Sequence, residues 1–116
     1  MRVSLFRRAI LAILFFVSVT ACQSAPAPSQ MNVSLKEWGI EPKAMTVKAG
    51  TVTFTIKNAG SLEHNFIIQG NSKIESIFAA QTKTLEATLT PGTYIVECDL
   101  SGHKEAGMTA TLTVVP

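Results

Sequence analysis

Apolar and polar residues alternate with a period of two along several short runs of this chain, and threonine occupies most of the polar positions. The pattern is clearest in residues 51–57, 84–89 and 109–114. Successive side chains of a β-strand point to opposite faces, so this alternation indicates strands with one buried and one solvated face. An amphipathic helix would instead need a period of about 3.6 residues. The chain is therefore predicted to be all-β.

Turn-forming residues separate these runs at short intervals. Several short strands with such spacing predict an antiparallel sandwich or barrel. Residues 72–80 show the weakest pattern, which leaves room there for a short helical turn. The length of 116 residues allows one domain. The turn sequences are Ala49-Gly50, Asn58-Ala59-Gly60, Gly70-Asn71-Ser72, Pro91-Gly92 and Ser101-Gly102.

The first residues have the composition of an export signal. Arg2, Arg7 and Arg8 precede an apolar run over residues 9–19 that only Ser18 interrupts. A transmembrane helix needs about 20 apolar residues, roughly twice the length of this run. A cleaved signal peptide over residues 1–21 is therefore favoured over a permanent membrane anchor.

The segment Val19-Thr20-Ala21-Cys22 resembles the bacterial lipobox, in which the cysteine is lipidated and becomes the first residue of the mature chain. The resemblance implies a lipoprotein that is anchored through Cys22 in the periplasm or at the cell surface. The alternative is ordinary cleavage nearby, which leaves Cys22 as a free thiol or pairs it with Cys98. Residues 22–30, rich in Pro, Ala and Ser, are expected to form a flexible tether to a folded domain over residues 31–116.

The distribution of charge argues against nucleic acid as a partner. The net charge of the whole chain is +2, and every arginine lies in the predicted signal peptide. The rest of the chain has seven lysines and eight acidic side chains, which gives a net charge of −1. A nucleic-acid surface needs Lys and Arg clustered on the folded part, so we expect none.

Cys98, His103 and Met108 form a Cys-x4-His-x4-Met pattern that indicates a metal site. Thiolate, imidazole and thioether are soft ligands that suit copper better than calcium or magnesium. Cys98 is in phase with Val96, and Met108 is in phase with Ala110, so both side chains can point inward from their strands.

His64 is the only other histidine in the chain and completes a set of four candidate ligands. Two histidines, one cysteine and a long axial methionine make up a blue-copper electron-transfer site. Zinc would accept both histidines and Cys98, but a thioether is a poor fourth ligand for it. A two-copper site needs a second cysteine in the loop, and residues 99–102 contain none. Nucleophilic catalysis by Cys98 with His103 lacks an accompanying substrate-binding signature, so we expect no enzyme activity.

The chain resembles the cupredoxin (blue copper) family, whose small members include plastocyanin and azurin. The resemblance lies in residues 41–54, Asn58, His64-Asn65 and residues 91–108. The resemblance covers nearly all of residues 31–116. It implies a Greek-key β-sandwich of about eight strands that holds one copper ion at one end.

The resemblance also implies a role for each residue of the site. His64, Cys98 and His103 would be equatorial ligands, and Met108 would be the axial ligand. Asn65 would tie the two ligand segments together by hydrogen bonds. Asp99 stands where members such as plastocyanin often have Ser or Thr. Its carboxylate either points inward and lowers the reduction potential, or is solvated and has little effect.

The expected function is that of a membrane-tethered, monomeric electron carrier that cycles copper between Cu(I) and Cu(II). Redox partner proteins would dock at the edge of His103, on a small apolar patch formed by Leu100, Gly102, Ala106 and Gly107. Two alternatives remain: a periplasmic protein that binds or delivers copper, and an accessory domain of a larger complex. The sequence lacks the Met-rich or His-rich tracts that copper-handling proteins often carry.

Overall fold

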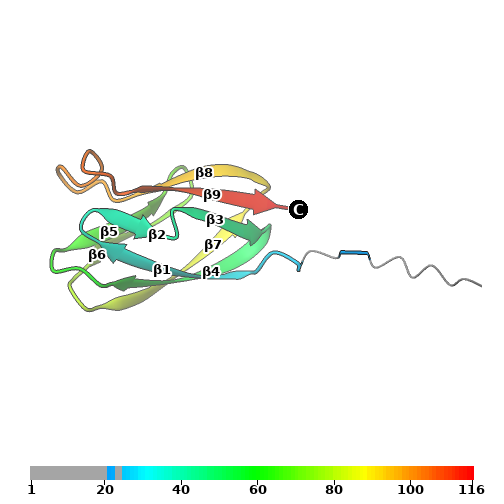
Figure 1. Cartoon of the computed structure of the whole chain (residues 1–116), viewed down its shortest axis with the longest axis horizontal. Helices are drawn as coiled ribbons and strands as arrows, with labels where there is room; N and C mark the ends of the chain where they lie inside the picture. Colours follow the sequence, from blue (N-terminus) through cyan, green and yellow to red (C-terminus); the bar gives the residue numbers. More distant parts are fainter. Residues whose placement is uncertain (1–20, 23–24) are drawn as a thin grey trace, which may run out of the picture.

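The computed structural model describes residues 21–22 and 25–116, and these residues form nine β-strands and no helix. The all-β prediction is confirmed. The strands lie in two sheets that face each other as a sandwich (Figure 1). In chain order they are β1 Gln30–Lys36, β2 Gly39–Glu41, β3 Ala44–Lys48, β4 Gly50–Asn58, β5 His64–Ile68, β6 Ser72–Ile77, β7 Thr82–Leu89, β8 Gly92–Glu97 and β9 Thr109–Val115.

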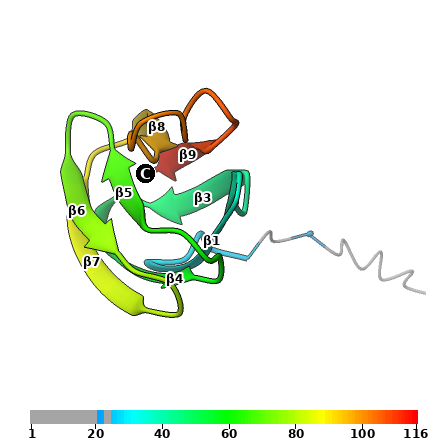
Figure 2. The ribbon, with the colours of Figure 1, turned by 90° about the vertical axis from the view of Figure 1, so that its left-hand side faces the viewer.

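The chain passes repeatedly from one sheet to the other. One sheet has the strand order β2-β1-β4-β7, and the other has the order β3-β9-β8-β5-β6. Figure 2 looks along the sandwich and shows how these crossings close the two sheets around a common interior. Most neighbouring strands are antiparallel, as predicted, but β1 pairs with β4 and β3 pairs with β9 in parallel. Parallel neighbours need a crossover connection, and the passages between sheets supply it.

The interior is filled by the residues that the alternating pattern assigned to one face. Val52, Phe54 and Ile56 of β4 are fully buried, and the residues between them are more exposed. Phe54 packs against Phe66 of the opposite sheet, with ring centroids 5.8 Å apart. This contact joins the two sheets through apolar burial, the main favourable term in folding.

Two segments differ from the expectation. Residues 72–77 form the edge strand β6 rather than a helical turn, and pair antiparallel with β5. A bulge between His64 and Phe66 shifts the register of this pair, which explains why the periodicity of the segment is weak. The count of nine strands exceeds the expected eight or so because the three-residue strand β2 is present.

The N-terminal region leaves the sandwich at the end that also holds the C-terminus, far from the β8–β9 loop (Figure 1). The main chain of Pro28 and Ser29 already accepts hydrogen bonds from Lys48 and Thr53, and β1 begins at Gln30. The predicted signal peptide lies outside the described residues, except for Ala21. Cys22 is exposed and is not paired with Cys98. Within the described part of the chain, no helix has the length and apolar character needed to span a membrane.

Candidate metal centre

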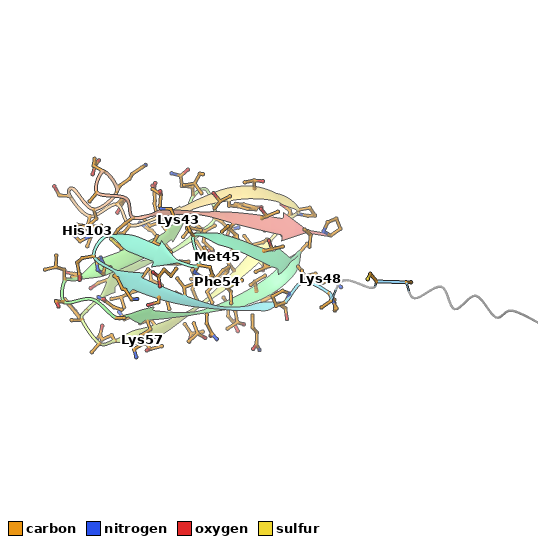
Figure 3. The ribbon with its side chains drawn as sticks, viewed as in Figure 1. Lys43, Met45, Lys48, Phe54, Lys57 and His103 are labelled. Carbon is orange, nitrogen blue, oxygen red and sulfur yellow. The ribbon has the colours of Figure 1, made fainter. Side chains whose placement is uncertain are left out.

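Three connections at one end of the sandwich bring the predicted ligands together. Cys98 directly follows β8, His103 lies in the β8–β9 loop, and Met108 immediately precedes β9. His64 is the first residue of β5, which pairs with β8 in the same sheet. Figure 3 shows His103 at this end and Lys48 at the other, where the tether leaves.

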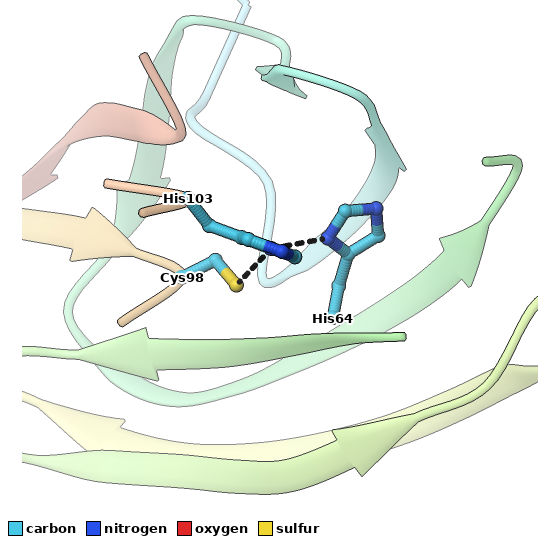
Figure 4. A group of neighbouring side chains, drawn as sticks. All are labelled: His64, Cys98 and His103. Atoms are coloured by element: carbon cyan, nitrogen blue, oxygen red, sulfur yellow. Dashed lines mark hydrogen bonds between the residues drawn. The ribbon is translucent and has the colours of Figure 1, made fainter. Parts of the chain in front are cut away.

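The side chains of His64, Cys98 and His103 converge on one point (Figure 4). The Nδ1 atoms of the two histidines are 3.2 Å apart, and the Sγ atom of Cys98 lies 3.4 Å from Nδ1 of His103. One donor atom from each residue lies within 4.8 Å of the other two. These are the residues that the sequence pattern predicted. The fold brings together the two histidines, which are 39 residues apart in the chain.

The separations fit a single metal ion. Ligand atoms bound to one metal at about 2.0–2.3 Å and spread at trigonal or tetrahedral angles lie about 3.3–3.9 Å from each other. The observed separations of 3.2 and 3.4 Å are close to that range. Two nitrogens and a thiolate sulfur form a soft donor set that suits copper, so the chemistry of the three residues agrees with the spacing.

Met108 is positioned by the main chain beside Cys98. Its carbonyl oxygen accepts a hydrogen bond from the N–H of Cys98 at 3.1 Å, and its own N–H donates to the carbonyl of His103 at 3.1 Å. The side chains of Cys98, Met108 and His64 are fully buried. The predicted axial residue is therefore buried and bonded through its main chain to Cys98 and His103, and its role as a ligand remains a prediction.

Asn65 links the two segments that carry the ligands. Its side-chain amide donates to Oδ1 of Asp99 at 2.6 Å, and its side-chain oxygen accepts the main-chain N–H of Asp99 at 3.0 Å. The main-chain N–H of Asn65 points at Sγ of Cys98, 3.4 Å away. A donor directed at the sulfur tunes a thiolate site, and the paired bonds fix the loop against β5.

The same contact answers the question about Asp99. Asp99 is exposed, and its carboxylate accepts a hydrogen bond from Asn65 rather than pointing at the cluster.

An ion pair lies next to Asp99, where the Nζ atom of Lys104 is 2.7 Å from Oε2 of Glu97. This ion pair lowers the pKa of Glu97 and raises the pKa of Lys104. It joins the last residue of β8 to the middle of the β8–β9 loop.

Glu37, in the turn between β1 and β2, is part of the site and was missed by sequence reasoning. Its Oε1 atom lies 3.0 Å from Nε2 of His64. The main-chain N–H groups of Leu62 and Ser61 donate to the same oxygen at 2.9 and 3.0 Å. The bond from Leu62 is the largest of the effects that lower the pKa of Glu37 to about 2, against the opposing effect of desolvation. No spacing rule connects Glu37 to a histidine 27 residues later, so the sequence carried no signal for it.

Trp38, the next residue, covers the second histidine. Its ring lies edge-on to the ring of His103, with centroids 5.0 Å apart and an interplanar angle of 72°. Trp38 is 46% exposed, so it forms part of the outer surface at this end. A Cβ at Gly107 would lie 3.2 Å from the carbonyl oxygen of Trp38, and Gly107 has a φ of +121°, so the loop passes closely beneath this turn.

A two-sheet sandwich with a His-Cys-His cluster at one end defines the class of small β-sandwich metalloproteins with a soft mononuclear site. The sequence matches the cupredoxin-like domain family over residues 8–114. The chain therefore belongs to the cupredoxin-like family, as the motifs predicted.

Known structures share this fold. A dithionite-reduced auracyanin of Roseiflexus castenholzii matches with a TM-score of 0.70 at 21% identity, covering 78% of this chain and 99% of that one. Auracyanin A of Chloroflexus aurantiacus, a "blue" copper protein, matches with a TM-score of 0.63 at 21% identity, covering 76% of this chain and 99% of that one. A multicopper oxidase matches with a TM-score of 0.64 at 18% identity, covering 81% of this chain but 46% of its own. No curated protein matches the sequence.

These findings support the predicted cofactor. The fold is that of blue copper proteins, and the side chains of His64, Cys98 and His103, with Met108 beside them, form a site whose donors fit one copper ion.

Replacing Asn65 by Ala tests the link between the two ligand segments. We expect the free energy of unfolding to fall by about 1–3 kcal/mol, because Asp99 loses its two hydrogen bonds to the side chain of Asn65. Urea denaturation followed by tryptophan fluorescence measures the change. The matched control is Asn32→Ala, an exposed asparagine on β1, which should change stability by less than about 0.5 kcal/mol. An equal effect of the two substitutions would contradict the assigned role.

Proposed function

We propose that this protein is a mononuclear blue copper protein that carries single electrons outside the cytoplasm. The observation that carries the proposal is the convergence of two Nδ1 atoms and the sulfur of Cys98 on one point. When bound there, copper supplies a one-electron couple between Cu(I) and Cu(II). The dithionite-reduced auracyanin supports redox use of the shared fold.

The residues of the chain would hold the donors in place and keep water out. His64 and Cys98 are fully buried, and both are attached to neighbouring strands of one sheet. Asn65 bonds across the gap between their two segments. Donors that are fixed before the metal binds need little rearrangement when its charge changes, which favours rapid transfer of an electron.

Electrons would enter and leave through His103. In contrast to His64, this residue is only partly buried, and Gly102 and Ala106 beside it in the loop are exposed. Trp38, which is partly exposed and packs against the ring of His103, adds to this surface. A small patch of this kind suits the brief, weak encounters of redox partner proteins.

The position of the tether supports attachment to a membrane through Cys22. The chain leaves the sandwich at the end opposite His103 (Figures 1 and 3). A lipid on Cys22 would leave the metal end free to meet partners, and residues 25–27 would act as a spacer before Pro28 bonds to the sandwich. We propose a lipoprotein of the periplasm or cell surface on this basis.

A carrier is favoured over an enzyme for this chain. The two auracyanins are covered over 99% of their length, whereas the multicopper oxidase is covered over 46% of its length. The fold found here thus accounts for a whole auracyanin and for less than half of the oxidase.

Adding Cu(II) to the purified protein, with a Cys98→Ser variant beside it, tests the metal centre. We expect an intense visible thiolate band that ascorbate bleaches and ferricyanide restores, and we expect no such band in the variant. Visible absorption spectroscopy is the measurement. Tight copper binding without the band would contradict the carrier function and favour copper handling. Failure to bind copper would overturn the metal assignment.

Placing a charge beside His103 tests the docking surface. For Ala106→Glu we expect electron self-exchange between oxidised and reduced copies to slow about tenfold, because like charges then face each other at the encounter. Line broadening in NMR spectra measures the rate. Thr51→Glu, at the other end of the sandwich, is the control and should leave the rate unchanged. Both variants should keep the visible spectrum of the wild type. Equal rates for Ala106→Glu and the wild type would count against the patch.

The variant Cys22→Ser tests the anchor. Expressed from the full-length sequence in bacteria, the wild type should incorporate labelled fatty acid and partition into the detergent phase. The variant should do neither, since it lacks the sulfur that carries the lipid. Cys98→Ser is the control and should behave like the wild type. Retention of Cys22→Ser in the detergent phase would rule out lipidation at this residue.

A further inference from the structure

The ring of His64 has a polar partner on each side. Its Nδ1 atom faces the cluster, 3.2 Å from Nδ1 of His103, and its Nε2 atom faces the carboxylate of Glu37 at 3.0 Å. An ionised carboxylate can only accept hydrogen bonds, so Nε2 must carry the proton. In a neutral imidazole one nitrogen is the donor and the other the acceptor. The contact with Glu37 therefore leaves a free lone pair on Nδ1, directed at the metal position.

The carboxylate of Glu37 is itself held by residues 60–62 of the β4–β5 loop. Main-chain N–H groups of Ser61 and Leu62 donate to the oxygen that faces His64. Gly60 leaves room for the carboxylate, because a Cβ on this residue would lie 2.2 Å from the same oxygen. Asn58 accepts the N–H of Gly60 and donates to the carbonyl of Leu62, which fixes the turn. The β4–β5 loop is thus shaped around the carboxylate immediately before it delivers His64.

We propose that Glu37 is a positioning residue that fixes the tautomer and orientation of His64 and strengthens Nδ1 as a donor to copper; this rests on the proposed function. A metal-bound histidine whose other nitrogen donates to a carboxylate is a more basic ligand. A more basic ligand stabilises the higher charge of Cu(II) more than that of Cu(I). Glu37 therefore raises the affinity for Cu(II) and lowers the reduction potential of the site.

If Glu37 had a purely structural role, its replacement would have different effects. If the carboxylate only anchors residues 60–62, its loss should lower stability and leave the electronic properties of His64 unchanged. Two variants separate these roles. Glu37→Gln keeps the size and the accepting oxygen but removes the charge. Gly60→Ala keeps the charge but displaces the carboxylate from Nε2, because the added methyl group occupies its place.

The matched control is Glu41→Gln. Glu41 lies in β2 of the same hairpin, and its exposed carboxylate contacts Lys36 at 3.5 Å rather than a histidine. Its replacement removes the same charge from the same region. Effects that come from net charge alone would appear in this control as well as in Glu37→Gln.

The experiment uses the full chain, purified in mild detergent at neutral pH. Nitrogen-15 NMR of the metal-free protein should show His64 protonated at Nε2 in the wild type and in Glu41→Gln, and a mixture of tautomers in Gly60→Ala. Competition with a chelator should show Cu(II) bound about 10–100-fold more weakly by Glu37→Gln and Gly60→Ala than by the wild type. Both variants should also have a higher reduction potential than the control.

Two results would overturn the proposal. One is a wild-type His64 protonated at Nδ1. The other is a pair of variants that lose stability but match Glu41→Gln in tautomer, affinity and potential. The tautomer of the metal-free protein is independent of copper chemistry, so a wild type without a thiolate band would defeat the proposed function while the NMR result would still decide the role of Glu37.

Discussion

The hydrogen-bonded contact between the start of β5 and the β8–β9 loop is the constraint on which the metal end of this protein depends. Asn65 makes two side-chain bonds to Asp99, and its main-chain N–H points at the sulfur of Cys98. These bonds hold together two segments more than 30 residues apart. Without them, His64 and Cys98 would be attached to the same sheet but free to separate at its end, since the register of β5 with β8 covers only Ile67 and Ile68.

The two sheets provide a rigid base for that contact and place it at the end opposite the N-terminal segment. Apolar side chains such as Phe54 and Phe66 fill the interior, and the strands carry the ligand segments to one end. The tether leaves at the opposite end (Figure 1). Because stability comes from the interior, the loops at the metal end can be shaped by the needs of the site. The close approach of Glu37 to Gly60 is one result of this freedom.

The two histidines have different surroundings, and the difference suits the proposed electron transfer. His64 is buried and bonded to a carboxylate, whereas His103 is partly exposed and touches the ring of Trp38. The first would set how strongly the metal is held in each charge state, and the second would form the path to partners. Glu37 and Trp38, adjacent residues of one turn, provide the two contacts, so this short turn would affect both properties.

The sequence by itself determined the strand character of the chain and the identity of the candidate ligands. Alternation of apolar residues is a local property, and the spacing of Cys98, His103 and Met108 around one loop is local too. Only the tertiary structure decided the parallel pairing of β1 with β4, the place of Asp99 and the contact of Glu37 with His64. Each of these depends on contacts between residues far apart in the chain. Such contacts follow from how the strands cross between the sheets, and the local sequence around each residue does not determine these crossings.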